Sequence, residues 1–384
     1  MGEQKAVWEN PAEIIRRLTP EHPVMVFAPT VLQQRARQFI AGFPGLVTYA
    51  VKSNPAEAVI QNLTSAGITG FDVASPVEID LIGRLAPGAA RHYHNPVRSR
   101  AEIRHAVQAG ILAWSVDSGT ELDKLLEAVP TRVGDAGVEI SPRFKLPVMG
   151  AVYDFGSKFG ASPEFAAQML ARVAEAGYVP SLTFHPGTQC MDPGAWESYI
   201  RVARDICDMA GVAIRRLNVG GGFPSHRVAG VDPDLQAIFA RIGEVTAQVF
   251  GEAAPQLVCE PGRALCADAF ALITRIKALR DGAHIFLNDG VYGGLFELPI
   301  VGNLDRVQVL APDGTKRQGE RGGRVIFGPT CDSVDRLPGE LSLPDDTAEG
   351  DYIVFQGAGA YSTVTNTRFN GYGQMGQMTA LALE

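Results

Sequence analysis

Short apolar runs alternate with longer amphipathic segments between residues 45 and 260. Each run is rich in β-branched or aromatic residues, which is typical of a strand, and the segments between them carry apolar residues at helical spacing. Several of these segments open with proline or serine and close on glycine, as helix caps do. The expected strands cover residues 46–52, 69–75, 91–95, 111–117, 138–146, 181–185, 215–221 and 256–260. Eight strands, each followed by a helix, predict a parallel (β/α)8 barrel of the TIM type.

The pattern changes after residue 265, where strand-like runs are joined by turns rich in Gly, Pro and Asp and long helical segments are nearly absent. These features predict an all-β domain, a sandwich or a β-barrel. The apolar run at residues 23–29 is expected to join it as a strand. We therefore expect a barrel domain over residues 30–265 and a β domain built from residues 1–29 and 266–384.

Polar or glycine residues stand at the ends of the eight expected strands. They are Lys52, Asp72, Asn95, Asp117, Arg143, His185, Gly220 to Gly222 and Glu260. Any one of them could be the solvated start of a loop, and a lysine there often extends its stem along the surface. In a (β/α)8 barrel, however, all strand ends share one face, and active sites form at that face. The set therefore predicts a site at the carboxyl end of the barrel.

Two glycine-containing loops follow the seventh and eighth expected strands. The first contains Gly220, Gly221 and Gly222 in succession, and the second contains Gly262 and Arg263 in the run "EPGRA". Three consecutive glycines do not have the spacing of a dinucleotide fingerprint. They could form a tight turn, or their backbone N–H groups could hold an anion. Because barrels often bind phosphate through these two loops, the pair favours a phosphate site.

A lysine amine, a phosphate site and an acid are the groups that pyridoxal phosphate requires. Lys52 could form a Schiff base with the cofactor, and Glu260 could keep its ring nitrogen protonated. His185 could stack on the ring, although a single histidine is often a structural residue. Pyridoxal 5'-phosphate is therefore the expected cofactor.

Composition narrows the function and location further. The chain has 384 residues, a formal charge of −8 and no run of Lys and Arg, so nucleic acid is not an expected partner. It lacks both a signal-peptide pattern and an apolar stretch of roughly 18 residues, so we expect a cytoplasmic protein without a membrane span. The five cysteines are widely spaced, so we expect free thiols and no metal site.

The sequence also resembles a known family over nearly its whole length. The motifs that carry this resemblance, in family order, are "YAVKSNP", "GFDVASPVEI", "SKFGAS", "FHPGTQCMDP", "NVGGGFP", "EPGRAL", "NDGVYGG", "GPTCDSVDRL" and "GAYSTVTNTRFNGY". Together they resemble the fold-type III pyridoxal-phosphate decarboxylases that act on ornithine, lysine, arginine and diaminopimelate. The ornithine decarboxylase branch is the most similar.

The resemblance implies a role for each of several residues. Lys52 would bind the cofactor aldehyde with Asp72 beside it, His185 would stack on the ring, and Glu260 would pair with the ring nitrogen. The remaining implied cofactor contacts are Arg143, Thr188, Gly220, Gly221, Gly222, Gly262, Arg263 and Tyr361. Thr188 stands where the family commonly has serine, a change that keeps the hydroxyl.

The resemblance further implies a homodimer with shared active sites, in which the loop carrying Cys331 and Asp332 reaches the partner's site. Cys331 would protonate the carbanion that remains after decarboxylation. Asp332 would bind the distal ammonium of a dibasic amino acid, and Tyr292 would line the same pocket. An ion pair between Lys158 and Asp335 is expected across the interface.

One departure from the family pattern affects the substrate. Ornithine decarboxylases carry a second aspartate for the distal amine, and the equivalent position here is Val301. Glu297 is a candidate for the missing acid. We expect conversion of L-ornithine to putrescine, a step of polyamine biosynthesis, with L-lysine to cadaverine as the alternative. Diaminopimelate is disfavoured because that branch has glutamate where this chain has Asp332. A non-catalytic homologue that binds a regulator is the alternative from another class.

Overall fold

The computed structural model describes residues 6–146, 158–302 and 304–384. The chain separates into two compact units. The barrel unit comprises Ala36–Pro224 and Asp234–Gly262, and the sheet unit comprises Met1–Arg35, Ser225–Pro233 and Arg263–Glu384. One family motif, "SKFGAS", begins at Ser157, which lies outside the described residues.

The barrel unit contains a parallel sheet in the order β10-β9-β6-β5-β4-β3-β13-β12-β11. These strands are β3 (Gly45–Ala50), β4 (Gly70–Val73), β5 (Ala90–Tyr93), β6 (Ala113–Val116), β9 (Glu139–Pro142), β10 (Val179–Pro180), β11 (Leu182–Thr183), β12 (Arg216–Asn218) and β13 (Gln256–Cys259). β10 pairs with β9 and β11 pairs with β12. A parallel bridge between Arg143 and Thr183 connects β9 to β11 and closes the ring. Because β10 and β11 flank the single residue Ser181, the ring has eight strand positions, and the predicted barrel fold is confirmed.

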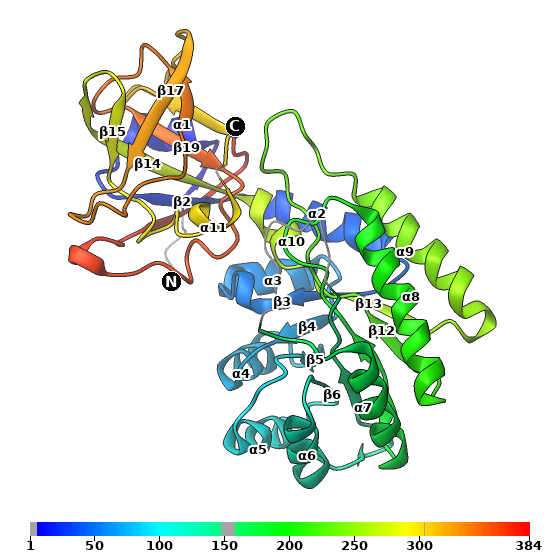
Figure 1. Cartoon of the computed structure of the whole chain (residues 1–384). Coiled ribbons are helices and arrows are strands. Elements are labelled where there is room, and N and C mark those ends of the chain that lie inside the picture. Colours follow the sequence, from blue (N-terminus) through cyan, green and yellow to red (C-terminus); the bar gives the residue numbers. More distant parts are fainter. Residues whose placement is uncertain (1–5, 147–157, 303) are drawn as a thin grey trace. The chain divides into compact units, whose positions relative to one another are not determined.

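Helices connect the barrel strands and lie outside them (Figure 1). They are α3 (Glu57–Ser65), α4 (Pro76–Leu85), α5 (Arg100–Gln108), α6 (Gly119–Ala128), α7 (Pro163–Glu175), α8 (Pro193–Ala210) and α9 (Leu235–Phe250). Serine caps begin four of them, since Ser75, Ser99, Ser118 and Ser162 each accept a hydrogen bond from the backbone of the first turn. The barrel strands β4, β6 and β9 consist of buried residues, as expected for strands covered by helices.

The sheet unit contains a second, mixed sheet of nine strands. They are β1 (Val7–Trp8), β2 (Val24–Phe27), β14 (Phe270–Arg280), β15 (His284–Leu287), β16 (Val307–Leu310), β17 (Arg321–Phe327), β18 (Leu341–Pro344), β19 (Tyr352–Gln356) and β20 (Gly376–Ala380). The predicted strand near the N-terminus is β2, which pairs with β14 on one side and with β20 on the other. Helix α1 (Pro11–Leu18) packs Ile14 and Ile15 into the core of this sheet. Both ends of the chain therefore contribute to one hydrophobic core.

Three further α-helices lie outside these two sets. They are α2 (Pro29–Gly42), α10 (Arg263–Cys266) and α11 (Leu298–Val301). Within the described ranges, no helix combines the length and the apolar composition needed to cross a membrane. All five cysteines are free thiols, and only Cys331 is exposed.

Candidate active site

Lys52 lies immediately beyond the first barrel strand. β3 ends at Ala50, and a single 3-10 turn, Val51–Ser53, carries the lysine. The hydroxyl of Ser53 donates to the Ala50 carbonyl at 2.8 Å and closes this turn. The loop after β13 approaches it closely, because a Cβ on Gly262 would lie 2.9 Å from the Ser53 hydroxyl oxygen. The backbone on both sides thus fixes the position from which Lys52 extends.

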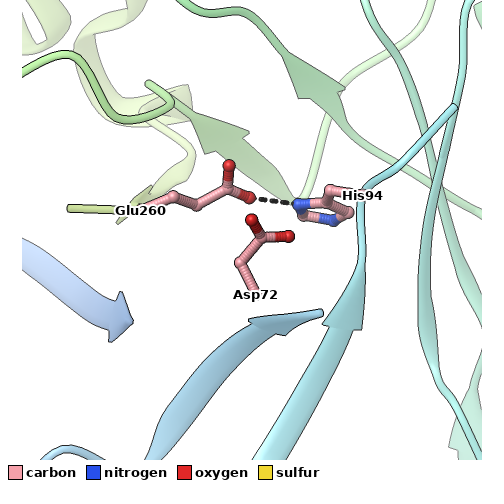
Figure 2. Close-up of side chains that lie close together, drawn as sticks. All are labelled: Asp72, His94 and Glu260. Atoms are coloured by element: carbon pink, nitrogen blue, oxygen red, sulfur yellow. Dashed lines mark hydrogen bonds and ion pairs between the residues drawn. The ribbon is translucent and has the colours of Figure 1, made fainter. Parts of the chain in front are cut away.

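Three titratable side chains from different strand ends meet inside the barrel (Figure 2). Asp72 lies on β4, His94 follows β5, and Glu260 follows β13, and their ligand atoms lie within 4.8 Å of one another. Nδ1 of His94 is hydrogen-bonded to Oε1 of Glu260. Asn218, the last residue of β12, donates from Nδ2 to the same carboxylate oxygen at 2.5 Å. Four strand ends, two on each side of β3 in the sheet order, therefore supply one buried polar cluster.

The orientation of the Asn218 amide is fixed by the backbone. Its Oδ1 accepts a hydrogen bond of 2.9 Å from the Gly220 N–H, so the amide nitrogen must face Glu260. Both donors to Glu260 bind Oε1, and among the described residues Oε2 receives no hydrogen bond. One oxygen of a largely buried carboxylate is thus left for another group.

Burial and mutual charge shift the pKa values of this cluster in different directions. Burial alone would raise the pKa of Glu260, but the charge and hydrogen bond of His94 and the donor Asn218 outweigh it and lower the pKa to about 2. Burial, helped by the charge of Glu260, raises the pKa of Asp72 to about 7. For His94, burial acts downward, yet Glu260 raises its pKa above the ordinary value. Glu260 is therefore the anion of the cluster at neutral pH.

His185 is a neutral imidazole whose tautomer is determined by the backbone. The Gly187 N–H donates to Nδ1 of His185 at 3.0 Å, so Nδ1 is the acceptor and Nε2 carries the proton. Burial, together with the positive charges of Arg143 and Lys52, lowers the pKa of His185 to about 3. A flat, uncharged ring is thus presented just beyond β11.

The three consecutive glycines permit close packing of the loops after β11 and β12. Gly220 and Gly222 have φ values of +70° and +84°, and a Cβ on either would lie 2.2 Å from a backbone oxygen of the β11 loop. A Cβ on Gly221 would lie 2.7 Å from the Glu260 carbonyl oxygen and 3.2 Å from Nε2 of His185. Side chains are therefore excluded here for steric reasons.

Arg143 and Thr188 also lie beyond the ends of barrel strands. Arg143 follows β9, and its guanidinium lies 5.3 Å from the centre of the Phe159 ring. Thr188 is half-buried in the loop after β11, and the next residue, Gln189, has a φ of +52°. The described barrel unit thus carries Lys52, Asp72, Arg143, His185 and Glu260 at one end of its strands, as the sequence predicts.

In the sheet unit, Glu297 forms a bidentate ion pair with Arg263. The guanidinium nitrogens Nη1 and Nη2 each donate to one of the two carboxylate oxygens, and the side chains of Arg263 and Glu297 are 7% and 16% exposed. The Arg263 guanidinium also lies 5.2 Å from the centre of the Tyr361 ring. The Nε of Arg263 is buried and has no partner in the described part of the chain. The sequence analysis proposed that Glu297 binds the distal amine of the substrate, whereas in the structure its carboxylate binds Arg263.

Tyr361 has an unusual backbone for a non-glycine residue, with a φ of +65°. Its carbonyl oxygen accepts hydrogen bonds from the N–H groups of Val364 and Thr365 at 3.0 Å, which hold this conformation. Strained residues of this kind concentrate at functional sites. The phosphate role that the family resemblance implies for Tyr361 stays a prediction.

Asp332 and Tyr292 meet elsewhere in the sheet unit. The Tyr292 hydroxyl donates to Oδ2 of Asp332 at 2.6 Å, and the backbone N–H of Val334 donates to Oδ1 at 3.0 Å. The Tyr292 hydrogen bond lowers the pKa of Asp332, so this side chain is anionic. Cys331, directly before it, is exposed. A carboxylate and an accessible thiol are thus adjacent.

Sequence reasoning missed His94 and Asn218. The run "RHYHN" places His92 and His94 at alternate positions of one strand, and this spacing puts both side chains on the same face. Two histidines facing the interior of a barrel are a signal that was available. The contact of Asn218 with Glu260 depends on strand register and leaves no such signal.

Comparison with known proteins gives a consistent result. Residues 30–267 match the sequence profile described as "Pyridoxal-dependent decarboxylase, pyridoxal binding domain". A lysine/ornithine decarboxylase of Selenomonas ruminantium is 30% identical over 334 residues, which cover 85% of this chain and 81% of that protein. Ornithine decarboxylase of Mus musculus is 31% identical over 84% of this chain and 73% of its own.

A solved structure is similar over nearly the whole length. It is a lysine/ornithine decarboxylase of Vibrio vulnificus complexed with cadaverine, with 27% sequence identity and a TM-score of 0.80. The alignment covers 97% of this chain and 99% of that chain. The similarity thus includes both the barrel unit and the sheet unit.

Proposed function

This chain belongs to the family of pyridoxal-dependent decarboxylases, and from that premise we propose that it decarboxylates L-ornithine to putrescine. L-lysine, which would give cadaverine, is the alternative substrate. The relatives named above support both, since their names include lysine as well as ornithine. The protein is thus a pyridoxal-phosphate-dependent lyase, and the choice of amino acid is our proposal.

The observation that carries the proposal is the pair of Lys52 and Glu260 at one end of the barrel. Glu260 is anionic, and its Oε2 has no donor among the described residues. This oxygen can therefore accept a hydrogen bond from the protonated ring nitrogen of the cofactor. The residues present therefore fit pyridoxal phosphate. When bound, this cofactor accepts into its protonated ring the electron pair that the departing carboxylate leaves behind.

The barrel residues would hold the cofactor in the following way. Lys52 would bind its aldehyde carbon, and the neutral ring of His185 would stack on it without adding charge. Asp72 would lie beside it, and Arg143 and Thr188 would complete the contacts. The residues expected to hold the phosphate are Gly222, Gly262, Arg263 and Tyr361. A positive guanidinium with an unpartnered Nε suits this anion.

We assign the substrate side to Asp332, Tyr292 and Cys331. The Asp332 carboxylate, kept anionic by the Tyr292 hydroxyl, would bind the distal ammonium of the amino acid. The Cys331 thiol would deliver the proton that replaces the lost carboxylate. Because both residues are present, a non-catalytic homologue is disfavoured, and an aspartate next to the cysteine disfavours diaminopimelate.

A homodimer with shared sites is part of the proposal, together with a cytoplasmic location. In it, Cys331 and Asp332 would act at the active site of the partner subunit. The expected interface pair of Lys158 and Asp335 is less strongly supported. Asp335 is 1% exposed, and its carboxylate already accepts hydrogen bonds from Val291 and Thr330.

The experiment that tests the function measures carbon dioxide release from a panel of amino acids. The panel contains the L and D forms of ornithine, lysine and arginine, and diaminopimelate. We expect the highest kcat/KM with L-ornithine and a lower value with L-lysine. Release from diaminopimelate alone would refute the proposed substrate. Absence of a visible cofactor band in the purified protein would refute the cofactor assignment.

A further inference from the structure

The contact of His94 with Glu260 extends the proposed function and rests on it. In the bound state, Glu260 has to leave the proton on the cofactor's ring nitrogen, which requires the carboxylate to be the weaker base of the two. A carboxylate buried without donors would instead take a proton, because burial disfavours its charged form. The groups that donate to Glu260 therefore determine where this proton resides.

Two side chains supply those donors, and both bind the same oxygen. His94 contacts Oε1 through Nδ1, and Asn218 donates to Oε1 from an amide whose orientation the Gly220 N–H fixes. Nδ1 also lies 2.9 Å from Nδ2 of Asn218, but it must carry a hydrogen in its contact with Glu260, since its partner there is an anion. This holds for the neutral and the charged imidazole alike. Oε2 is left without a donor in the described part of the chain.

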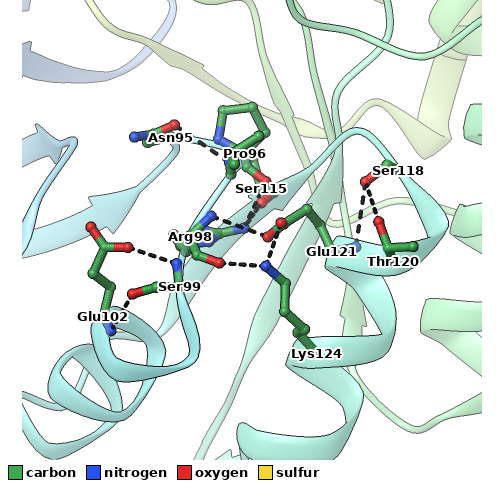
Figure 3. A network of polar contacts seen from close by, with 11 residues as sticks. Asn95, Pro96, Arg98, Ser99, Glu102, Ser115, Ser118, Thr120, Glu121 and Lys124 are labelled. Carbon is green, nitrogen blue, oxygen red and sulfur yellow. Dashed lines mark hydrogen bonds and ion pairs between the residues drawn. The ribbon is translucent and has the colours of Figure 1, made fainter.

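The surrounding structure holds His94 in place. The Ser115 hydroxyl donates to the His94 carbonyl at 2.7 Å. Figure 3 shows the polar network that follows it along the chain, in which the buried guanidinium of Arg98 binds the carbonyl of Ser115. The same guanidinium donates to the carbonyl of Tyr93 at 3.1 Å. The backbone on both sides of His94 is thus tied to β6 and to the turn that follows β5. A residue held this firmly can orient its neighbour.

We propose that His94 is a positioning residue for Glu260: it occupies Oε1, leaves Oε2 for the ring nitrogen of bound pyridoxal phosphate, and so keeps the proton on that nitrogen. His94 acts through Glu260 and need not touch the cofactor. His92 provides the comparison, because it is a buried histidine two residues earlier on the same face and makes no hydrogen bond to Glu260. Burial lowers its pKa to about 3, so it stays neutral.

The test compares His94→Leu with His92→Leu in the holoprotein. Each is loaded with pyridoxal phosphate labelled with 15N in the ring, and the 15N chemical shift of that nitrogen reports whether it is protonated. We expect a protonated nitrogen in the wild type and in His92→Leu. In His94→Leu the shift should move toward the unprotonated value, and kcat should fall about ten- to a hundredfold, with KM changed less. His94→Gln, which keeps an N–H donor, should recover part of the wild-type 15N shift and part of the wild-type kcat.

The outcomes separate this inference from the proposed function. If the wild type binds no cofactor, or holds it with an unprotonated ring nitrogen, the proposed function fails at Glu260. If the cofactor's ring nitrogen is protonated in the wild type and has the same 15N shift in His94→Leu, the role of His94 is refuted and the proposed function stands. Should His94→Leu not fold, 15N-histidine spectra of the wild-type holoprotein replace it. A protonated Nδ1 on His94 is expected there, and a bare Nδ1 would overturn the proposal.

Discussion

At the scale of single residues, the least expected finding is the partner of Glu297. The sequence offers it as an acid for the distal amine of the substrate, yet its two oxygens bind the guanidinium of Arg263. An ion pair that is largely buried cannot release one member without leaving the other uncompensated. Glu297 therefore orients Arg263, and we expect it to affect the cofactor more than the choice of substrate.

This expectation is tested with Glu297→Gln. Loss of one charge should weaken the hold on Arg263 and raise the dissociation constant of pyridoxal phosphate about tenfold, as titration of the apoprotein would measure. The ratio of kcat/KM for ornithine and lysine should not change. The control is Glu244→Gln, which removes an exposed ion pair with Arg241. It should change neither the dissociation constant of the cofactor nor the ratio of the two kcat/KM values. A changed substrate preference would restore the original hypothesis for Glu297.

Asp289 gives a second prediction at this scale, concerning pH. Burial raises its pKa to about 7, and nearby Asp335 adds to the effect. The folded state therefore binds a proton more tightly than the unfolded chain between about pH 4 and 7. Ionisation across this window destabilises the fold, so this residue's contribution to the free energy of unfolding falls as pH rises, by up to about 1.4 kcal/mol per pH unit.

Asp289→Asn removes this contribution. Urea unfolding of both proteins between pH 4 and 7 should show that the wild type loses stability relative to the variant as pH increases. The amide can still accept a hydrogen bond from the Gly294 N–H, which binds Oδ2 at 3.0 Å in the wild type. Two stability curves that run parallel over the window would contradict the prediction.

At the scale of elements, the turn after β5 depends on the buried Arg98. It is 2% exposed, and burial lowers its pKa to about 10, so it remains charged at neutral pH. Its guanidinium satisfies carbonyls of Tyr93 and Ser115, and its backbone N–H donates to Glu121. Lys124 binds both Glu121 and the Arg98 carbonyl. This network joins β5, β6 and α6.

Arg98→Leu should therefore destabilise the folded protein. It leaves buried carbonyls without donors, and we expect a loss of about 3 kcal/mol in the free energy of unfolding, measured by urea denaturation. Arg100→Leu, two residues later, breaks only the exposed ion pair with Glu127 and should cost less than about 1 kcal/mol. Equal losses in the two variants would show that the network does not stabilise this turn.

Elements were more predictable than contacts. The strands and helices of the barrel follow from local periodicity, and each of the eight expected runs contains a strand. The sequence placed Lys52 at a strand end, whereas it lies on a 3-10 turn that Ser53 closes, a detail decided by one side-chain hydrogen bond. The partners of Glu260 and Glu297 could not be predicted, because they depend on which strands and loops become neighbours. Such contacts depend on strand pairing and loop packing between segments far apart in the chain, and no local sequence pattern indicates them.

At the scale of the whole molecule, the proposed dimer makes a prediction about mixing. Lys52→Ala removes the group proposed to bind the cofactor, and Asp332→Ala removes one that would act in the partner's site. If sites are shared, each variant alone is inactive, but a mixed dimer has one site with both defects and one with neither. Random reassociation should then restore about one quarter of wild-type activity. Turnover measured after mixing and dilution tests this, and sites contained within one subunit would give no recovery.

The pairing of β2 has a consequence for how the chain is made. β2, an apolar strand near the start of the chain, is completed on one side by β14 and on the other by β20, at Gly376 to Thr379. A ribosome adds about 5–20 residues per second, so Val24 waits roughly 20 to 70 seconds for its last partner. Throughout that time the strand has an open edge that can pair with another nascent chain. The yield of this protein in a cell should therefore depend on chaperones that cover β2 until β20 has been synthesised.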